Sequence, residues 1–515
     1  GDCRQKAMDR AAVYVRQSPG RFPPIADIFA RMCTTTSTSI LLVAVNARYG
    51  HCAFAARSLL ANLGALRRQA AILETDLDAQ PFQLAAEVVA RRPRVAGFSV
   101  YLWNVRIVRE TLAILRRVAP RVRVVLGGPE IVDGCAAGWR GLADDLVVGE
   151  GETAFRRICE EVPGSGTSQQ PGKNGGEEPR VVLACPEPVS GLALPYDLYT
   201  DTDIAHRTIF VEASRGCPFV CAYCTSCGTG LRQISLEHLL PAIDRLLERG
   251  VRAFRFLDRS LNASEPPACG LLDFFLARHP GRLQLHFEIM PCRLTEPLRQ
   301  RLAAFPPGVL HLEVGVQTLN ESVARNIGRR VPNGTVLETL DFLSRATRAT
   351  VHADLIFGLP GEDAASFAAG FDRLVRAFDF PELQVNLLKR LPGTPLANEP
   401  RFAGLVFNPH PPYELLAGDA LDFAAICRLQ QFARCWELVH NRGRFSRAAA
   451  LLWQAGGASP HQRYQALAAR IHAAEGRLHA LGMERLGGHV AQFLQEDCGL
   501  PAAEAQAAVA ADVAG

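Results

Sequence analysis

The chain has 515 residues, of which 48% are hydrophobic and 21% charged, and its formal net charge is +4. This length exceeds what one core holds, so we expect two or three domains, while the small net charge and the lack of long basic runs exclude a dedicated nucleic-acid binder. No apolar stretch reaches the roughly 20 residues of a membrane span, and no signal-peptide core opens the chain, so we expect no membrane span and a cytoplasmic protein with reduced thiols. Residues 1–38 are assigned to an N-terminal extension, with Met32 a candidate for the native start.

Residues 39–160 alternate short apolar runs with amphipathic helical stretches. The runs are ILLVAV (40–45), AAILET (70–75), VAGFSV (95–100) and VRVVLGG (122–128). They predict an α/β domain with a parallel sheet covered on both faces, of the doubly wound, flavodoxin- or Rossmann-like class. Ligands of such sheets bind at the carboxyl ends of the strands. The candidate contacts there are Asn46, Arg48, Tyr49 and His51, then Ser99, Tyr101, Leu102 and Asn104, and then Gly127, Gly128, Pro129 and Glu130.

The loop after the first run lacks a dinucleotide fingerprint. N-A-R-Y-G-H (46–51) does not supply G-x-G-x-x-G, which disfavours a nicotinamide dehydrogenase. The Gly127–Gly128 pair either lets the backbone approach a large ligand closely or only forms a tight turn.

Four motifs resemble the cobalamin-binding domain of B12-dependent radical SAM proteins: N-x-R-Y-x-H at 46–51, G-F-S-V-Y-x-W-N at 97–104, L-G-G-P-E at 126–130 and V-V-G-E-G-E at 147–152. The resemblance implies a corrin over the strand ends, contacted by the twelve candidate residues, with its nucleotide tail passing Ser99 and Gly127–Gly128. The better-known D-x-H-x-x-G pattern is absent, because Tyr49 stands two residues before His51. We therefore expect cobalamin held without a protein imidazole, with ligation by His51 as the alternative.

Residues 161–200 are expected to form a flexible insertion and a linker. PGSGTSQQPGKNGGEEPR (163–180) is rich in Gly, Ser, Pro and charge, and LALPYDLYTDTD (192–203) is expected to connect the domains across the surface.

Four of the 15 cysteines gather in RGCPFVCAYCTSC (215–227). Cys217, Cys221 and Cys224 have the spacing C-x3-C-x2-C, with which three thiolates can ligate three irons of a cubane and leave the fourth iron open. With Cys227 they could instead hold a structural zinc, whereas the ferredoxin order C-x2-C-x2-C is absent. We interpret Cys227 as a small buried residue.

The C-x3-C-x2-C loop, with Tyr223 before the third cysteine, resembles the radical S-adenosylmethionine (SAM) signature. The resemblance implies a [4Fe-4S] cluster that cleaves SAM to a 5′-deoxyadenosyl radical, with flavodoxin or ferredoxin as reductant. Apolar runs at 208–214, 251–257, 283–289, 309–316, 350–357 and 383–388 fit the partial (β/α)6 barrel of that family, here at residues 201–400. The implied SAM-binding residues are Tyr223, Asp258, Glu288, Gln317 and Asp354, although L-D-R-S replaces the usual G-G-E motif at Asp258. No catalytic residue is assigned.

Residues 401–515 are predicted to form a mostly helical C-terminal domain. P-P-Y-E (411–414), Q-F-A-R-C-W-E-L (431–438) and N-R-G-R-F (441–445) resemble a subgroup of uncharacterised B12-binding radical SAM proteins. That subgroup is distantly similar to the anaerobic magnesium-protoporphyrin monomethyl ester cyclase group.

These resemblances imply a cobalamin-dependent radical SAM enzyme acting on an unidentified small molecule or peptide. Methylation of an unactivated carbon is the preferred hypothesis, and radical oxidation or cyclisation without methyl transfer is the alternative. Two non-enzymatic hypotheses stay open: a cobalamin sensor or electron-transfer protein, and a zinc-stapled structural protein.

Overall fold

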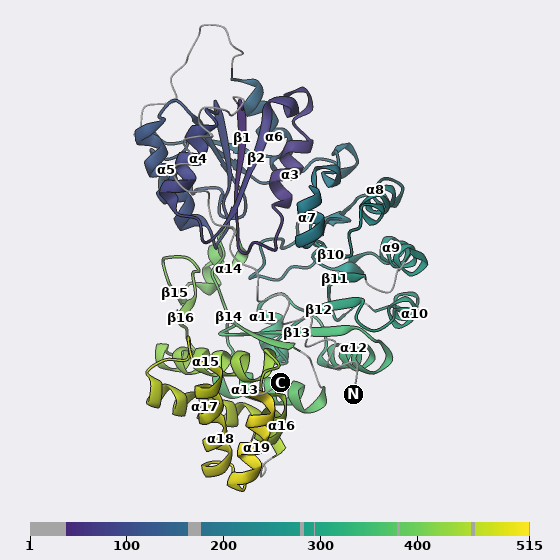
Figure 1. Ribbon diagram of the computed structural model, residues 1–515, viewed down its shortest axis with the longest axis vertical. Coiled ribbons are helices and arrows are strands. Elements are labelled where there is room, and N and C mark those ends of the chain that lie inside the picture. Colours follow the sequence, from purple (N-terminus) through teal and green to yellow (C-terminus); the bar gives the residue numbers. More distant parts are fainter. Residues whose placement is uncertain are drawn as a thin grey trace. The chain divides into compact units, whose positions relative to one another are not determined.

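The computed structural model describes residues 38–162, 177–278, 283–292, 294–378, 382–454 and 459–513. The chain divides into two compact units, Gly1–Pro186 and Glu187–Gly515, which are treated separately below (Figure 1). The expected N-terminal extension, apart from its last residue, and the core of the expected insertion, 163–176, lie outside the described residues. In the described ranges, no helix is both long and apolar enough to cross a bilayer.

The first unit is a parallel sheet with helices on both faces, which confirms the predicted doubly wound fold. The strands are β1 (Ile40–Asn46), β2 (Ala70–Asp76), β3 (Val95–Ser99), β4 (Arg123–Gly127), β5 (Asp145–Val148) and β6 (Arg180–Leu183), in the order β2-β1-β3-β4-β5-β6. The helices are α3 (Phe54–Ala61), α4 (Pro81–Ala90), α5 (Val105–Val118) and α6 (Gly151–Glu160). Helices α4 and α5 cover one face and α3 and α6 the other (Figure 1). The central strands are buried on both sides, which explains their continuous apolar runs.

Strand β6 differs from the sequence prediction, because Arg180–Leu183 falls within the expected insertion and linker. It pairs in parallel with β5 and forms an edge of the sheet. Three of its four residues are exposed, so it buries little apolar surface and leaves a weak signal beside a polar insertion. The division between the two units follows Pro186.

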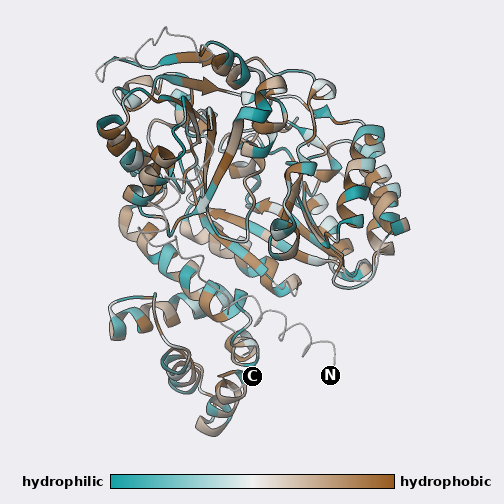
Figure 2. Cartoon of the chain, turned by 45° about the horizontal axis from the view of Figure 1, so that its top comes forward, coloured by the Kyte–Doolittle hydropathy of each residue, from teal (hydrophilic) through white to brown (hydrophobic). Residues whose placement is uncertain are grey.

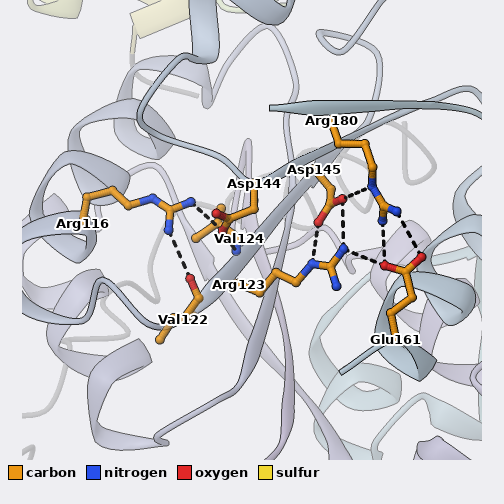
Figure 3. Close-up of polar contacts among 8 residues, drawn as sticks. All are labelled: Arg116, Val122, Arg123, Val124, Asp144, Asp145, Glu161 and Arg180. Carbon is orange, nitrogen blue, oxygen red and sulfur yellow. Dashed lines mark hydrogen bonds and ion pairs between the residues drawn. The ribbon is translucent and has the colours of Figure 1, made fainter. Parts of the chain in front are cut away.

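An ion-pair network ties together the amino ends of β4, β5 and β6 (Figure 3). The buried Asp145 carboxylate accepts from Arg123 Nε at 2.7 Å and from Arg180 Nε at 2.6 Å. Both arginines also contact Glu161, and the hydrogen bonds from Arg180 are the main reason that the pKa of Glu161 is lowered. Beside them, Asp144 accepts from Arg116 at 2.7 Å. This network fixes the end of the sheet opposite to its carboxyl edge.

The second unit is built on six parallel strands in an open arc, which confirms the predicted partial barrel. They are β7 (Ile209–Val211), β10 (Ala253–Phe256), β11 (Gln284–Ile289), β12 (Leu310–Gln317), β13 (Thr350–Phe357) and β14 (Glu382–Leu387), in the order β14-β13-β12-β11-β10-β7. The helices of this part are α7 (Asp201–His206), α8 (Leu236–Glu248), α9 (Glu265–Arg278), α10 (Glu296–Ala304), α11 (Glu321–Asn326), α12 (Asn333–Ala346) and α13 (Ala364–Ala377). Most of them lie along the outer side of the arc (Figure 1).

The strands of this arc alternate between apolar and polar residues. In β12, Leu310, Leu312, Val314 and Val316 are buried, whereas His311, Glu313, Gly315 and Gln317 are only half-buried. Because successive side chains of a strand point to opposite faces, the apolar set packs on the helices and the polar set faces the interior of the arc. In Figure 2 the strands are predominantly hydrophobic, whereas the helices alternate in hydropathy.

The C-terminal part is mostly helical, as predicted, and belongs to the second unit. A small hairpin of β15 (Val406–Phe407) and β16 (Leu415–Ala417) follows the short helix α14 (Pro395–Asn398). The remaining helices are α15 (Phe423–Trp436), α16 (Ser446–Gln454), α17 (Pro460–Glu475), α18 (Met483–Glu496) and α19 (Ala502–Val513). Trp436 Nε1 donates to Leu383 O at 2.7 Å and packs on Phe371 of α13, which fixes these helices to the outer side of β14.

Candidate functional site

The cysteine-rich loop follows the first strand of the arc and is closed by a two-stranded ladder. Strand β8 (Ser214–Arg215) enters the loop and pairs antiparallel with β9 (Arg232–Gln233), which leaves it. Inside, Cys224 N donates to Cys221 O at 3.0 Å and Gly228 N donates to Phe219 O at 2.9 Å. From outside, Ala222 N donates to Ile327 O at 2.9 Å. These contacts hold the loop in one conformation.

Cys217, Cys221 and Cys224 meet in one cavity of about 170 Å³ at the carboxyl end of the arc. The cavity is lined by Cys217, Phe219, Cys221, Tyr223, Cys224, Arg259, Glu288, Ile289, Met290, Glu313, Gly315, Gln317, Arg329 and Asp354. Burial raises the pKa of the Cys217 and Cys224 thiols, which the nearby Arg259 opposes. Thiolates here would therefore depend on neighbouring positive charge.

Cys227 departs from its expected role as a small buried residue. Its side chain is half-buried, and it does not line the cavity. It continues the turn of the loop, since its N–H donates to Cys224 O at 3.2 Å. Every described cysteine is a free thiol.

Two of the predicted SAM-binding carboxylates face the cavity from neighbouring strands. Burial raises the pKa of Glu288, on β11, to about 7, despite the opposing charge of Arg259. Asp354, on β13, also has a raised pKa because it is buried, although the neighbouring His352 works against this shift. Both carboxyls would therefore hold a proton more readily than exposed ones.

Gln317 stands at an irregularity of β12. The register with β13 shifts between Gly315 and Gln317, and Gln317 has φ +71°, which is unusual for a residue with a side chain. Its Oε1 atom is buried with no hydrogen-bond partner among the described residues. Gln317 therefore combines a strained backbone with a buried acceptor that has no partner among the described residues.

Asp258 is the predicted SAM-binding residue that the structure does not bring into the cavity lining. Its carboxylate accepts from Ala213 N at 2.9 Å and from Ser214 Oγ at 2.6 Å. Its carboxylate therefore joins the segment after β10 to the entry of the cysteine loop.

Arg329 lies against the cysteine loop and was not among the residues predicted from the sequence. Its guanidinium lies 3.7 Å from Cys221 Sγ and 3.4 Å from Tyr223 Oη, and it also donates to Gly315 O. No sequence pattern pointed to Arg329, which lies in the short turn between α11 and α12 and is buried. Buried arginines are rare unless they are paired.

In the first unit, the predicted cobalamin contacts gather at the carboxyl edge of β1, β3 and β4. The side chains of several of them form hydrogen bonds to the neighbouring backbone. Buried Asn104 donates through Nδ2 to Val45 O at 3.1 Å and to Ser99 O at 3.0 Å. Asn46 donates to His51 O at 2.8 Å, and Glu130 is buried. These side chains shape the edge. Arg48, Tyr49 and Pro129 are exposed there, while His51, Ser99, Tyr101, Leu102, Gly127 and Gly128 are half-buried.

Trp103 is a further aromatic residue of this edge, missing from the predicted contacts. It is 46% exposed, and Tyr49 is 45% exposed. The Trp103 ring stacks on Tyr101 at 4.4 Å between centroids and 8° between planes, and its Nε1 donates to Val45 O at 3.1 Å. The pair thus forms a rigid aromatic surface between β1 and β3, where the strand order of the sheet reverses. Ligands of doubly wound sheets bind at that position.

Gly128 lets two loops of this edge approach closely. It has φ +103°, and a Cβ atom added there would lie 2.6 Å from Val100 O. The glycine pair therefore does more than form a turn, because only a residue without a side chain permits this contact between the loops after β3 and β4.

Three family models match the chain in order. Residues 40–159 match the B12 binding domain, residues 211–374 the Radical SAM superfamily, and residues 403–509 a family described as a protein of unknown function, DUF4080. These matches confirm the resemblances inferred from the sequence. The chain is a radical SAM superfamily protein that carries a B12-binding domain.

Individual relatives match over part of their length. A 2-(S-pantetheinyl)-carbapenam-3-carboxylate methyltransferase of Streptantibioticus cattleyicolor is 26% identical, over 61% of this chain and 49% of that protein. A tRNA-2-methylthio-N(6)-dimethylallyladenosine synthase of Acidithiobacillus ferrooxidans is 30% identical, over 36% of this chain and 44% of that protein. The chain thus spans less than half the length of these curated relatives.

The fold is shared with a solved structure. The cobalamin-dependent S-adenosylmethionine radical enzyme OxsB, with aqua-cobalamin and S-adenosylmethionine bound, superposes with a TM-score of 0.60 at 12% identity, over 92% of this chain and 83% of that chain. At this identity the likeness concerns the fold.

Proposed function

We propose that the chain is a cobalamin-dependent radical SAM enzyme whose reaction centre is the cavity behind the cysteine loop. The observation that carries the proposal is that Cys217, Cys221 and Cys224 line the same cavity as Glu288 and Gln317. The thiols come from one loop, and the polar groups come from the inner face of the arc. The matches to a B12-binding and a radical SAM model support the same function.

The three thiols fit a [4Fe-4S] cluster. Each of Cys217, Cys221 and Cys224 would ligate one iron and leave the fourth iron open. A structural zinc in this loop would need Cys227 as its fourth thiolate, and Cys227 does not line the cavity that the other three cysteines share. A cluster held by these three thiols would supply the electron for the reductive cleavage of SAM.

The walls of the cavity fit SAM, which carries an ammonium, a carboxylate and ribose hydroxyls. Gln317 Oε1 needs a donor, and the ammonium or a hydroxyl would satisfy it. Glu288 and Asp354 would accept from the remaining donors, and Arg329 would balance the carboxylate. Tyr223 would be held against the ligand by Arg329, whose guanidinium its hydroxyl contacts. These residues would orient SAM and exclude water from it.

The carboxyl edge of the first unit fits a corrin. The exposed aromatic rings of Tyr49 and Trp103 offer apolar surface, and Gly128 permits a close approach of the backbone. Asn46 donates a hydrogen bond to the backbone carbonyl of His51 and not to its imidazole. Ligation of cobalt by that imidazole is the alternative. We keep the prediction that cobalamin is bound here without a protein imidazole. When bound, cobalamin would supply methyl transfer or redox chemistry.

Methylation of an unactivated carbon is the reaction we favour. Of the two relatives named above, the methyltransferase matches the larger share of this chain. That match supports methylation. Radical oxidation or cyclisation without methyl transfer is the alternative, and the substrate is a small molecule or a peptide. A flavodoxin or ferredoxin would supply the electron.

The proposal is tested by anaerobic reconstitution with iron, sulfide and cobalamin, followed by metal analysis and a SAM-cleavage assay with dithionite. We expect about four irons per chain, as one cubane requires, bound corrin, and 5′-deoxyadenosine. Cys221→Ala should lose both iron and cleavage. Cys227→Ser, three residues beyond the last predicted ligand and outside the cavity, is the matched control and should keep both.

Two results would contradict the proposal. Zinc in place of iron would indicate a structural site. A complete cluster and bound corrin without any SAM cleavage would favour a cobalamin sensor or an electron-transfer protein. Once a substrate is found, the reaction is run with SAM whose methyl group is deuterated, and the mass of the product is measured. A deuterated methyl group in the product indicates methyl transfer, and its absence indicates oxidation or cyclisation.

A further inference from the structure

The D-R-S-L-N segment after β10, residues 258–262, lies beside the cysteine loop and has no role in the proposed function. It stands where the G-G-E motif of the family is absent. We infer that Arg259, in this segment, is a redox-tuning residue whose positive charge stabilises the reduced form of the iron-sulfur cluster. The inference rests on the proposed function, because it needs a cluster at Cys217, Cys221 and Cys224.

Buried polar side chains fix this segment at both of its ends. At its start, the Asp258 carboxylate accepts from Ser214 Oγ at 2.6 Å, at the entry of the cysteine loop. At its end, Asn262 Nδ2 donates to Met290 O at 2.7 Å, just after β11, and Asn262 Oδ1 accepts from Met290 N at 3.0 Å. Ser260 Oγ also donates to Asn262 Oδ1, at 2.7 Å. The backbone is therefore held between the cysteine loop and the end of β11.

Arg259 is the residue that this fixed segment presents to the cavity. Asp258, Ser260 and Asn262 are buried, whereas Arg259 is exposed and lines the cavity. Its guanidinium takes part in no hydrogen bond or ion pair with the described residues. Arg329, by contrast, is tied to Gly315 O. A guanidinium that a fixed backbone carries unpaired into a cavity points to a role toward what fills that cavity.

The charge of Arg259 acts on two of the three thiols. Burial raises the pKa of the Cys217 and Cys224 thiols, and the charge of Arg259 opposes the shift at both. Arg329 lies against the third thiol, 3.7 Å from Cys221 Sγ. The two arginines come from different elements, the segment after β10 and the turn after α11. Together they place positive charge beside all three thiols.

The carboxyls of the same cavity act against this positive charge. Glu288, Glu313 and Asp354 line the cavity. Burial raises the pKa of Glu288 to about 7 and also raises that of Asp354, which reduces their negative charge at a given pH. Glu313 is paired with Arg255 at 3.1 Å. Arg259 has no such partner among the described residues, and a guanidinium keeps its charge at every working pH.

Reduction of a cluster in the cysteine loop would add one negative charge to the site. An external reductant gives one electron to the oxidised cluster, no bond forms or breaks, and this chain supplies no proton. A fixed positive charge nearby favours the more negative state and therefore raises the reduction potential. Since Arg259 is exposed, salt should screen part of its effect.

The test is a redox titration of the reconstituted protein without SAM, in which electron paramagnetic resonance measures the reduced cluster. The variants form a charge series: Arg259→Lys keeps the charge, Arg259→Gln removes it and Arg259→Glu reverses it. Arg252→Gln is the matched control, because Arg252 is an exposed arginine just before β10 that does not line the cavity. The iron content of each protein is measured first.

The reduction potential should follow the charge at position 259. Arg259→Gln should lower the equilibrium constant for reduction by about tenfold, which corresponds to about 59 mV for one electron, and Arg259→Glu should lower it further. Arg259→Lys and the control Arg252→Gln should stay near the native value. Added salt should shrink the differences within the series. A merely structural role would change the iron content and would not follow the sign of the charge.

Equal potentials in the Lys, Gln and Glu variants, each with its full iron content, would overturn the inference. If Arg259→Glu does not assemble a cluster, the comparison between Arg259→Lys and Arg259→Gln decides in the same way. A failure of the proposed function would look different. It would appear as a native chain that binds no iron, or whose cluster is reduced by dithionite and does not cleave SAM.

Discussion

His352 Nε2 lies 3.3 Å from Asp354 Oδ1, so an imidazole on the inner face of β13 pairs with a carboxyl that lines the cavity. On its other side, His352 Nδ1 lies 3.6 Å from Glu382 Oε2. Burial works to lower the pKa of His352, but Asp354, Glu382 and Glu313 outweigh it and raise this pKa above its ordinary value. The ring thus links the cavity to a half-exposed carboxylate on the edge strand.

The pairing predicts a specific pH dependence. A histidine whose pKa is raised on folding stabilises the folded state fully below the unfolded pKa, about 6.5, and this stabilisation is lost as pH rises through the folded pKa. His352→Gln should therefore lower the thermal unfolding temperature below pH 6.5 and have little effect well above the raised pKa. Melting curves across this range check the prediction.

His311 is the matched control on the neighbouring strand. The pKa of His311 is lowered, chiefly by burial. Because the folded state disfavours protonation of this ring, His311 reduces stability in acid and has no such effect at high pH. His311→Gln should thus raise acid stability relative to the native chain, opposite in sign to His352→Gln. The same sign for both substitutions would show that the Asp354 pair is not what sets the His352 effect.

Arg329 predicts a dependence on side-chain shape as well as charge. It reaches Cys221, Tyr223 and the Gly315 carbonyl at once, which a planar fork can do and a lysine ammonium cannot. Arg329→Lys should keep most of the iron but raise the KM for SAM by about tenfold with a smaller effect on kcat, since about 1.4 kcal/mol of binding corresponds to that factor.

Iron content and steady-state SAM cleavage measure the effect of this substitution. Arg330→Lys is the control, because Arg330 is the adjacent residue and is exposed. An unchanged KM in Arg329→Lys would mean that Arg329 only supports the loop and does not face SAM.

Gly128 predicts a steric limit at the carboxyl edge of the first unit. Gly128→Ala combines positive φ with a Cβ atom 2.6 Å from Val100 O, so the loops after β3 and β4 must separate. We expect the free energy of unfolding to fall by about 2 kcal/mol or more. Cobalamin binding, measured by corrin absorbance, should also weaken. Gly134→Ala isolates the backbone effect, since Gly134 has φ +80° but no atom within 4 Å. Equal losses in both variants would show that φ alone matters.

Trp103 predicts a contribution of aromatic surface to cobalamin binding. Trp103→Ala should weaken binding by about tenfold, within the range for loss of a buried aromatic contact, and it should remove fluorescence quenching on titration with cobalamin. Trp103→Phe keeps the stacking on Tyr101 but loses the bond to Val45 O, so its affinity should be intermediate. An unchanged affinity in Trp103→Ala would place the corrin elsewhere on this edge.

The candidate site was partly accessible from the sequence. The spacing of Cys217, Cys221 and Cys224 predicted thiols that share one site, and the ends of the strands predicted Glu288 and Asp354 beside them. Asp258 also follows a strand, yet its carboxylate turns back to Ser214 because unpaired N–H and hydroxyl donors there need an acceptor. Position at a strand end therefore selects candidates but does not determine which way a side chain points.

Two parts of the molecule were decided by contacts between distant segments. Arg329 meets Cys221 across 108 positions of the chain, and Arg401 reaches Asn326 across 75, which no local pattern encodes. Edge strand β6 was missed because its residues bury little.

By itself the sequence determined the first four strands of one sheet, the six strands of the other, the order of the two sheets along the chain and the cysteine spacing, because strand periodicity and loop motifs are local properties of neighbouring residues. Only the tertiary structure decided which polar groups share the cavity, where Trp103 lies and how the segment around Arg259 is held. Those arrangements depend on packing and pairing between residues that are far apart in the chain, and the free energy of such contacts is settled only when the whole unit folds.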